Sequence, residues 1–224
     1  MAKRTRSKPT NSLPVGRSER RHWVLERLRE DARTCQRCDL WRHSTQTVFG
    51  EGPANTDLML VGEQPGDAED IQGHPFVGPA GRILLEALSQ AGLSDTPYYL
   101  TNAVKHFKWE PRGKRRIHVR PSTSEVLACS YWLEGEIASV RPRVLVALGA
   151  TAVRALLGPR PRVSRDRGHW LPSVFGPPVL VTVHPSSVLR IADREERHAA
   201  LNALVHDLRQ VTSRLASRDA RTTS

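Results

Sequence analysis

Four short apolar runs, each bounded by polar or Gly-rich turns, are spaced along the middle of the chain. Continuous apolar runs of this length are typical of parallel strands that are buried on both faces of a sheet. The predicted strands cover residues 57–63, 98–104, 143–149 and 179–184.

The segments between and around these runs have the pattern of helices. Residues 82–92 are amphipathic and end at a glycine, and Ser122 with Glu125 has the spacing of a capping box. The predicted helices cover residues 18–33, 82–92, 122–140, 150–157 and 195–215. Because strands alternate with helices, the sequence predicts an α/β fold, with one four-stranded parallel sheet flanked by helices on both faces.

Polar, low-complexity segments bound this pattern at both ends. We expect residues 1–17 to form a disordered basic tail, residues 18–215 the single domain, and residues 216–224 a second disordered tail. At 224 residues the chain is long enough to bury a core without disulfides. Its 3 cysteines cannot form a closed disulfide set, and no apolar run approaches a membrane span. These features predict an intracellular, cytoplasmic protein with no membrane partner.

The charge balance makes nucleic acid the first partner to consider. The chain has 34 Lys and Arg against 23 Asp and Glu, a formal net charge of +11. Part of that charge lies in the N-terminal tail, so the folded body is less basic than the total. Charge alone is equally compatible with a basic surface that serves only solubility.

Polar residues collect where the predicted strands end. The stretch 62–67 follows the first strand, Asn102 lies at the end of the second, and residues 184–187 follow the fourth. Ligands of open parallel sheets bind beyond the carboxyl ends of the strands, so we place the site there. The simpler alternative is a set of strand-to-loop turns with acidic caps and a structural histidine.

The cysteines suggest a metal centre. Cys35 and Cys38 form a Cys-x-x-Cys pair, Cys129 lies far downstream, and His106 is a candidate fourth ligand because it follows the second strand. Three cysteines and one histidine suit either zinc or an iron–sulfur cluster, and the spacing does not separate the two. Cys129 is also compatible with simple helix packing.

Residues 113–118 form a basic run that ends in His118. Such runs are most often solvated loops or phosphate-binding patches. Lys114, Arg115 and Arg116 are therefore candidates for contacts with a nucleic-acid backbone.

Taken together, four of these segments resemble the uracil-DNA glycosylase superfamily, and within it the family 4 iron–sulfur enzymes. The segments are residues 62–66, 73–81, 114–118 and 184–187, and the resemblance covers roughly residues 34–208. The segment 114–118 further resembles the UdgX group, which forms a covalent complex with uracil-containing DNA.

The resemblance implies a structural [4Fe–4S] cluster that braces the DNA-binding loops. Its ligands would be Cys35, Cys38, His106 and Cys129. Family 4 enzymes have cysteine where this chain has His106, whereas UdgX-like sequences have histidine there.

The resemblance also implies roles in the pocket. Phe76 would stack on the flipped uracil, Asn102 would bond its pyrimidine edge, and His184 would stabilise the charge that develops near O2. Glu63 would lie near the cationic sugar carbon, and His118 would be the nucleophile. Further implied substrate contacts come from Gln64, Asp67, Ser186 and Arg190.

These roles predict a glycosylase that acts once. Neutral imidazole of His118 would attack the sugar C1′ in place of water, with Glu63 orienting it or accepting its proton. The resulting imidazole–sugar bond lacks a good leaving group and should persist. We expect single-stranded DNA to be favoured, because flipping the base out then costs less, and we expect a monomer. The alternatives are a conventional family 4 enzyme that releases an abasic site with turnover, and a non-catalytic metal-containing nucleic-acid-binding protein.

Overall fold

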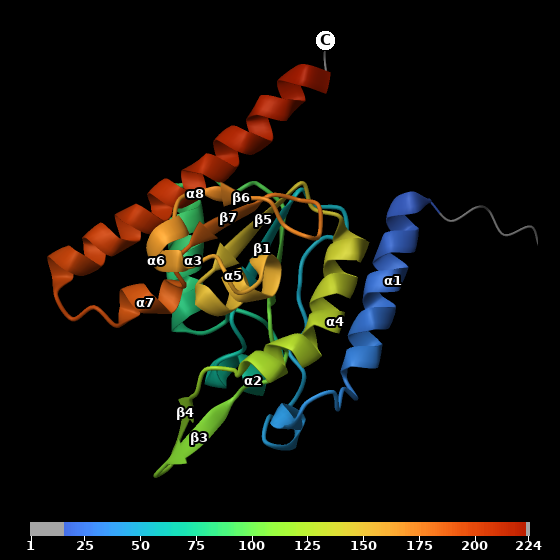
Figure 1. Cartoon of the computed structure of the whole chain (residues 1–224), viewed down its shortest axis with the longest axis vertical. Helices are drawn as coiled ribbons and strands as arrows, with labels where there is room; N and C mark the ends of the chain where they lie inside the picture. Colours follow the sequence, from blue (N-terminus) through green and yellow to red (C-terminus); the bar gives the residue numbers. More distant parts are fainter. Residues whose placement is uncertain (1–15, 223–224) are drawn as a thin grey trace, which may run out of the picture.

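The four predicted strands form the parallel part of one sheet in the computed structural model, which describes residues 16–222. Of the predicted N-terminal tail only residues 16 and 17 are described, and residues 223–224 lie outside the described part. The strands follow one another across the sheet in the order β2–β1–β5–β7. Figure 1 labels β1, β5 and β7 next to one another. Their bounds are β1 (Leu58–Gly62), β2 (Tyr98–Asn102), β5 (Val144–Leu148) and β7 (Val179–Thr182).

A fifth strand extends the sheet beyond the predicted four. β6 (Trp170–Leu171) pairs antiparallel with β7 at the edge. Two residues carry no measurable hydrophobic period, so the sequence pattern could not reveal this strand. The predicted parallel α/β fold is confirmed, with this antiparallel addition.

The five predicted helices are all present. Their bounds are α1 (Arg17–Ala32), α3 (Pro79–Gln90), α4 (Thr123–Val140), α5 (Ala150–Leu157) and α8 (Arg194–Thr222). α8 therefore continues past residue 215, into the segment for which we expected a disordered tail. Four short helices were not predicted: η1 (Asp39–Arg42), α2 (Asp67–Gln72), α6 (Val163–Asp166) and α7 (Pro185–Leu189). None of the described helices is both long and apolar enough to cross a membrane.

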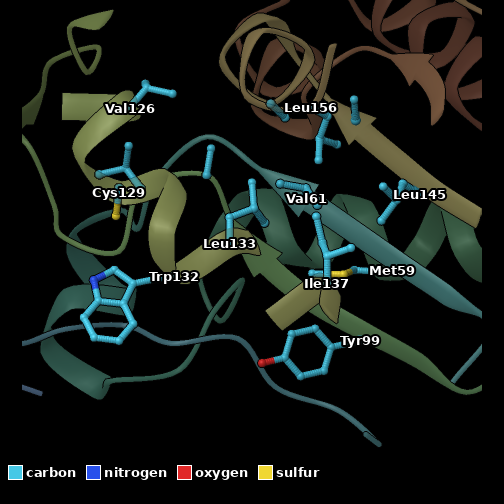
Figure 2. Packing of buried hydrophobic residues seen from close by; sticks show 14 of the residues in the cluster. Met59, Val61, Tyr99, Val126, Cys129, Trp132, Leu133, Ile137, Leu145 and Leu156 are labelled. Atoms are coloured by element: carbon cyan, nitrogen blue, oxygen red, sulfur yellow. The ribbon is translucent and has the colours of Figure 1, made fainter. Parts of the chain in front are cut away.

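Alternate residues of the central strands pack into two separate cores. Met59 and Val61 of β1 face α4 and α5, whereas Leu58 and Leu60 face α3 and α8. Figure 2 shows the first core, in which α4 lies against β1 and β2. The sheet is thus covered on both faces, and its strand ends are left as the place for a site.

A second, two-stranded sheet projects away from the body (Figure 1). It is a hairpin of β3 (Trp109–Arg112) and β4 (Arg115–His118), joined by a turn in which Gly113 has a φ of +61°. At its base, the Val119 N–H donates to the Lys108 carbonyl across 3.0 Å. The basic run that ends in His118 is therefore a strand on a hairpin and not a plain loop.

Candidate active site

The polar residues at the strand ends meet where the order of the strands reverses. The chain passes from β1 outward to β2 and then returns to β5 on the other side of β1. Such a reversal opens a crevice at the carboxyl ends of the two central strands. Glu63 follows β1 directly and Thr151 lies in the first turn of α5, so their side chains meet across this crevice.

Glu63 is paired with His118 from the hairpin. His118 Nε2 lies 3.1 Å from Glu63 Oε1, and the second carboxylate oxygen, Oε2, accepts a hydrogen bond from Thr151 Oγ1. Arg120 Nε is 3.7 Å from the same Oε2. The hairpin therefore brings its last residue onto the acidic side chain that follows the first strand.

Hydrogen bonding keeps the Glu63 carboxylate ionised. Burial on its own raises the pKa of this group, but the hydrogen bonds from His118 and Thr151 outweigh burial and lower the pKa to about 2. Glu63 is consequently an anion throughout the neutral range. A fixed negative charge at this point stabilises positive charge that develops nearby.

His184 caps α7 with its own ring. Its Nδ1 accepts the Ser186 N–H across 3.2 Å and lies 2.8 Å from Ser186 Oγ, which in turn accepts from Arg190 Nη1 across 3.1 Å. Burial lowers the pKa of His184 to about 4, so the ring is neutral at pH 7. Because Nδ1 is an acceptor, the ring proton lies on Nε2, which is a donor. Ser186 and Arg190 thus support His184.

Phe76, Asn102 and Gly62 lie together beside these residues, and this group of three is called the slot below. The Phe76 and His184 ring centroids are 6.0 Å apart. A Cβ placed on Gly62 would overlap Asn102 Oδ1 and lie 2.5 Å from Phe76 Cζ, so only glycine fits between them. Phe76 itself has a φ of +57°, an unfavourable conformation for a residue with a side chain.

The side-chain oxygen of Asn102 has no hydrogen-bond donor. Asn102 is 2% exposed, and among the described residues its Oδ1 is the one buried side-chain nitrogen or oxygen that lacks a hydrogen-bond partner. An unpaired buried polar atom is costly, and its usual explanation is a group supplied from outside. This oxygen lies next to Gly62, beside Phe76, and an N–H donor on a ligand bound there would satisfy it.

Gln64 is engaged within the protein. Its Nε2 donates to the Lys108 and Val119 carbonyls, and its Oε1 accepts the Lys108 N–H, all at 3.1 Å. These partners are the two residues that flank the hairpin. In this structure Gln64 braces the base of the hairpin, whereas the sequence predicts a substrate contact.

Arg116 and Asp67 also contact each other. Arg116 Nε donates to Asp67 Oδ1 and its Nη1 donates to Asp70 Oδ2, both at 2.6 Å. The guanidinium carbon lies 5.4 Å from the Phe107 ring centroid and 5.5 Å from that of Trp109. Arg116 was the predicted phosphate contact and Asp67 the predicted substrate contact. In the structure they bind each other, and this ion pair, the Arg116 clamp, ties β4 to α2.

The other two members of the predicted basic set lie at the end of the hairpin. Lys114 follows the Gly113 turn, Arg115 opens β4, and both are exposed. Within the described part of the chain, neither side chain forms a salt bridge. They extend the charge of the hairpin outward from the pocket.

The three cysteines come from two separate segments. Cys35 and Cys38 lie between α1 and η1, and Cys129 lies on α4. Cys35 Sγ accepts from Trp132 Nε1 across 3.1 Å, and Cys129 Sγ accepts the Lys105 N–H across 3.2 Å. N–H donors to sulfur stabilise bound thiolates, as they do around iron–sulfur clusters.

The pKa values of the cysteines and of His106 show which of these groups must lose a proton before they can bind a metal. Burial raises the pKa of Cys129 to about 12 and also raises the pKa of Cys38. Repulsion between the cysteine thiolates adds to both shifts. Burial lowers the pKa of His106 to about 4, and its Nε2 lies 3.1 Å from Thr47 Oγ1. Among the described residues no three His, Cys, Asp or Glu side chains surround a single ion position.

Sequence reasoning missed three residues of the site. Thr151 and Arg120 contact Glu63, and Asp70 anchors Arg116. Thr151 gives a weak signal, since it is a hydroxyl residue just past the end of a predicted strand. Arg120 and Asp70 have no pattern that separates them from other surface charges.

The fold and this arrangement define an α/β enzyme with an aromatic and amide slot beside an ionised carboxylate and two histidines. The model of the family described as the uracil DNA glycosylase superfamily matches residues 49–209. The chain therefore belongs to the uracil DNA glycosylase superfamily, and it is an enzyme of that class.

Curated relatives place it near the type-4 enzymes. It is 36% identical over 182 residues to the type-4 uracil-DNA glycosylase of Thermotoga maritima, covering 81% of this chain and 91% of the relative. It is 34% identical over 173 residues to the type-4 enzyme of Saccharolobus solfataricus, covering 74% and 77%. A type-5 enzyme of Pyrobaculum aerophilum is 34% identical over 148 residues, covering 59% and 62%.

Proposed function

We propose that this protein excises uracil from DNA and then keeps the deoxyribose through a covalent bond to His118. The observation that carries the covalent step is the contact of His118 Nε2 with Glu63 Oε1 at 3.1 Å. A histidine oriented by a carboxylate is the arrangement used in nucleophilic catalysis. Membership of the glycosylase superfamily supports the excision step.

The slot suits a flipped uracil. The unpaired Asn102 Oδ1 accepts the N3–H of the base, and Phe76 stacks on its face. His184 donates from Nε2 to the O2 region, where negative charge grows as the glycosidic bond breaks. A neutral ring on His184 is suited to this donation, because its pKa of about 4 keeps Nε2–H in place at neutral pH.

The chemical step follows from the ionised carboxylate. The bond between C1′ and N1 breaks, its electron pair leaves with uracil, and Glu63 stabilises the cationic sugar carbon. The lone pair of His118, on the ring nitrogen that does not face Glu63, then forms the new bond to C1′. The proton on Nε2 stays hydrogen-bonded to the Glu63 anion until solvent removes it, and solvent protonates the departing uracil anion, which leaves a neutral imidazole–sugar adduct.

A [4Fe–4S] cluster fits the donor set. Three thiols lie close enough to repel as anions, two of them accept N–H bonds, and the neutral His106 offers an imidazole nitrogen. Each donor of a cluster binds a different iron, so the donors need not converge on one point. When bound, the group would brace the segments that carry Cys35, Cys38, His106 and Cys129. A brown protein with iron and sulfide supports this assignment, and a colourless zinc protein contradicts it.

The second candidate is a conventional glycosylase that hydrolyses the sugar bond and turns over. The type-4 relatives favour it, because they carry that enzyme name and span most of this chain. In that case water, activated beside Glu63, would attack C1′. His118 would then contribute to positioning only.

A denaturing gel separates the two candidates. The purified chain is mixed with a labelled single-stranded oligonucleotide that contains one uracil, beside a thymine control and the variant His118→Ser. A uracil-dependent band that survives heat and SDS, and is lost in His118→Ser, supports trapping. Alkali-cleavable abasic DNA without such a band supports the conventional enzyme. Neither product, from a preparation with its metal centre intact, contradicts both.

A further inference from the structure

We propose that Thr151 is the positioning residue of Glu63, holding one carboxylate oxygen so that the other stays on His118. This inference rests on the proposed function, since it concerns the carboxylate that orients the proposed nucleophile. Nothing in the resemblance to known families assigned a role to this residue.

Two different elements fix the two oxygens. Thr151 Oγ1 donates to Oε2 from the first turn of α5, and His118 Nε2 lies on Oε1 from the end of β4. Thr151 is 5% exposed and belongs to a helix that packs against the sheet. It is therefore a rigid anchor, whereas the hairpin projects from the body. Without Thr151 the carboxylate can rotate about its side-chain bonds and leave His118.

The charged neighbours of Glu63 cannot replace this anchor. Arg120 is 3.7 Å away with a side chain that is 65% exposed, so solvent screens it and its long chain is free to move. His184 affects the carboxylate only through space and is neutral at pH 7. Thr151 is a neutral donor, and it holds the carboxylate without competing with His118 for its negative charge.

Removing the hydroxyl should therefore change trapping more than excision. In Thr151→Val the side chain keeps its size, and the negative charge stays near the sugar, so uracil release is reduced less than adduct formation. A hydrogen bond to a charged group is lost, and we expect the ratio of adduct formation to uracil release to fall about tenfold.

Rescue by the conservative variant supplies a readout that simple loosening would not move. Thr151→Ser keeps the hydroxyl that donates to Glu63 Oε2, whereas Thr151→Val keeps the shape of the side chain without that donor. His118, Arg120 and His184 still face the carboxylate and are the same in all variants. The ratio of adduct formation to uracil release should therefore be kept in Thr151→Ser and lowered in Thr151→Val.

The experiment compares the native chain, Thr151→Val and Thr151→Ser in single-turnover reactions at pH 7. Uracil release and adduct formation are measured on the same single-stranded uracil oligonucleotide. We expect Thr151→Ser to behave as the native chain, and Thr151→Val to show the lowered ratio of adduct formation to uracil release. Equal ratios for the Ser and Val variants would overturn the role of Thr151. Absence of adduct in the native chain would instead overturn the proposed function, and this inference with it.

Discussion

The arrangement of Phe76 and Asn102 depends on the absence of a side chain at Gly62. Gly62 ends β1 and lies between the Asn102 amide and the Phe76 ring, at a distance that leaves no space for a Cβ. The backbone there is an ordinary strand, so the requirement for glycine comes from the side chains around it. Phe76 and Asn102 can lie this close together because position 62 has no side chain.

We expect Gly62→Ala to abolish base excision while the protein remains folded. The added methyl must displace Phe76 or the Asn102 oxygen, which are the two groups proposed to hold the base. Overpacking of this kind costs about 1–3 kcal/mol, less than the stability of a typical domain. Uracil release and circular dichroism are measured together, with Gly16→Ala as a control for the substitution itself, because a Cβ there meets only Glu19 Oε2 at an ordinary 3.5 Å and the φ of Gly16 is −56°. Normal uracil release by Gly62→Ala would contradict the proposed slot.

Residue types were easier to predict than their partners. The sequence predicts that Glu63 orients His118, and the two are in contact. It also predicts substrate or phosphate contacts for Gln64, Asp67 and Arg116, which in the structure are satisfied by one another and by the hairpin. A polar side chain at a strand end can face a ligand or a neighbour, and only the three-dimensional arrangement separates these cases.

The hairpin is the element that delivers His118, and three interactions hold it in place. Gln64 bonds its base, Arg116 clamps β4 to α2, and the Trp109 Nε1 donates to the His43 carbonyl across 2.9 Å. None of these lies in the main sheet. The position of His118 is therefore set by side chains, and the hairpin can be loosened without disturbing the core.

We expect Arg116→Gln to slow adduct formation and loosen the hairpin. Asp70, which is fully buried, would lose its cation, a change that costs roughly 1–3 kcal/mol. Hydrogen exchange over residues 109–118 should become faster, while exchange in the central strands should not change. The matched control is Arg115→Gln, at the exposed tip, which removes the same charge. Equal effects of the two variants would show that charge and not the clamp matters.

The sequence predicted the elements that have a clear hydrophobic pattern and missed those that have none. The strands of the main sheet are continuous apolar runs, and α4 opens with the predicted capping box, in which Ser122 Oγ accepts the Glu125 N–H. The hairpin has no apolar alternation, and Pro111 argues against a strand by pattern. The hairpin forms against the local strand preference of its residues, and the hydrogen bonds of Gln64 and Arg116 hold it to the body.

At the scale of the whole molecule, a buried ion pair connects the pocket with the cysteines. Lys105 Nζ lies 2.6 Å from Glu136 Oε2 and donates to the Asn102 carbonyl, and both charged side chains are fully buried. The Lys105 N–H bonds Cys129. The strand that carries Asn102 is thereby fixed to α4. No sequence pattern indicated this pair, because a single lysine and a single glutamate 31 positions apart look like surface residues.

We expect the stability of the protein to decrease as the pH falls from about 6.5 towards 4. His184 has a pKa lowered to about 4 in the folded state against 6.5 when free, so the unfolded chain binds a proton first. Its contribution is complete above pH 6.5 and is lost as the pH falls through this window. Thermal unfolding at pH 7 and pH 5 checks this, with His184→Gln as the comparison. The melting temperature of that variant should fall less over the interval, and an equal fall would contradict the shift.

The fold class followed from the sequence because it depends on the apolar runs alone, whereas the distribution of charge did not. The excess of basic residues made nucleic acid the first partner to consider, but it gave no positions for the charges. In the structure several arginines form local ion pairs, among them Arg116, Arg143 and Arg167. These guanidinium groups have acidic partners within the protein, which their places in the sequence did not reveal.

The closed base of the hairpin has a consequence for how such proteins can diverge. Lys108 and Val119 are bonded to each other, so the chain leaves the body and returns to it at one point. Ten residues can be exchanged there for a short turn with little effect on either core, and the pocket behind would persist. Under the proposed function, the covalent step is carried by this replaceable segment, so it can be gained or lost separately from the fold.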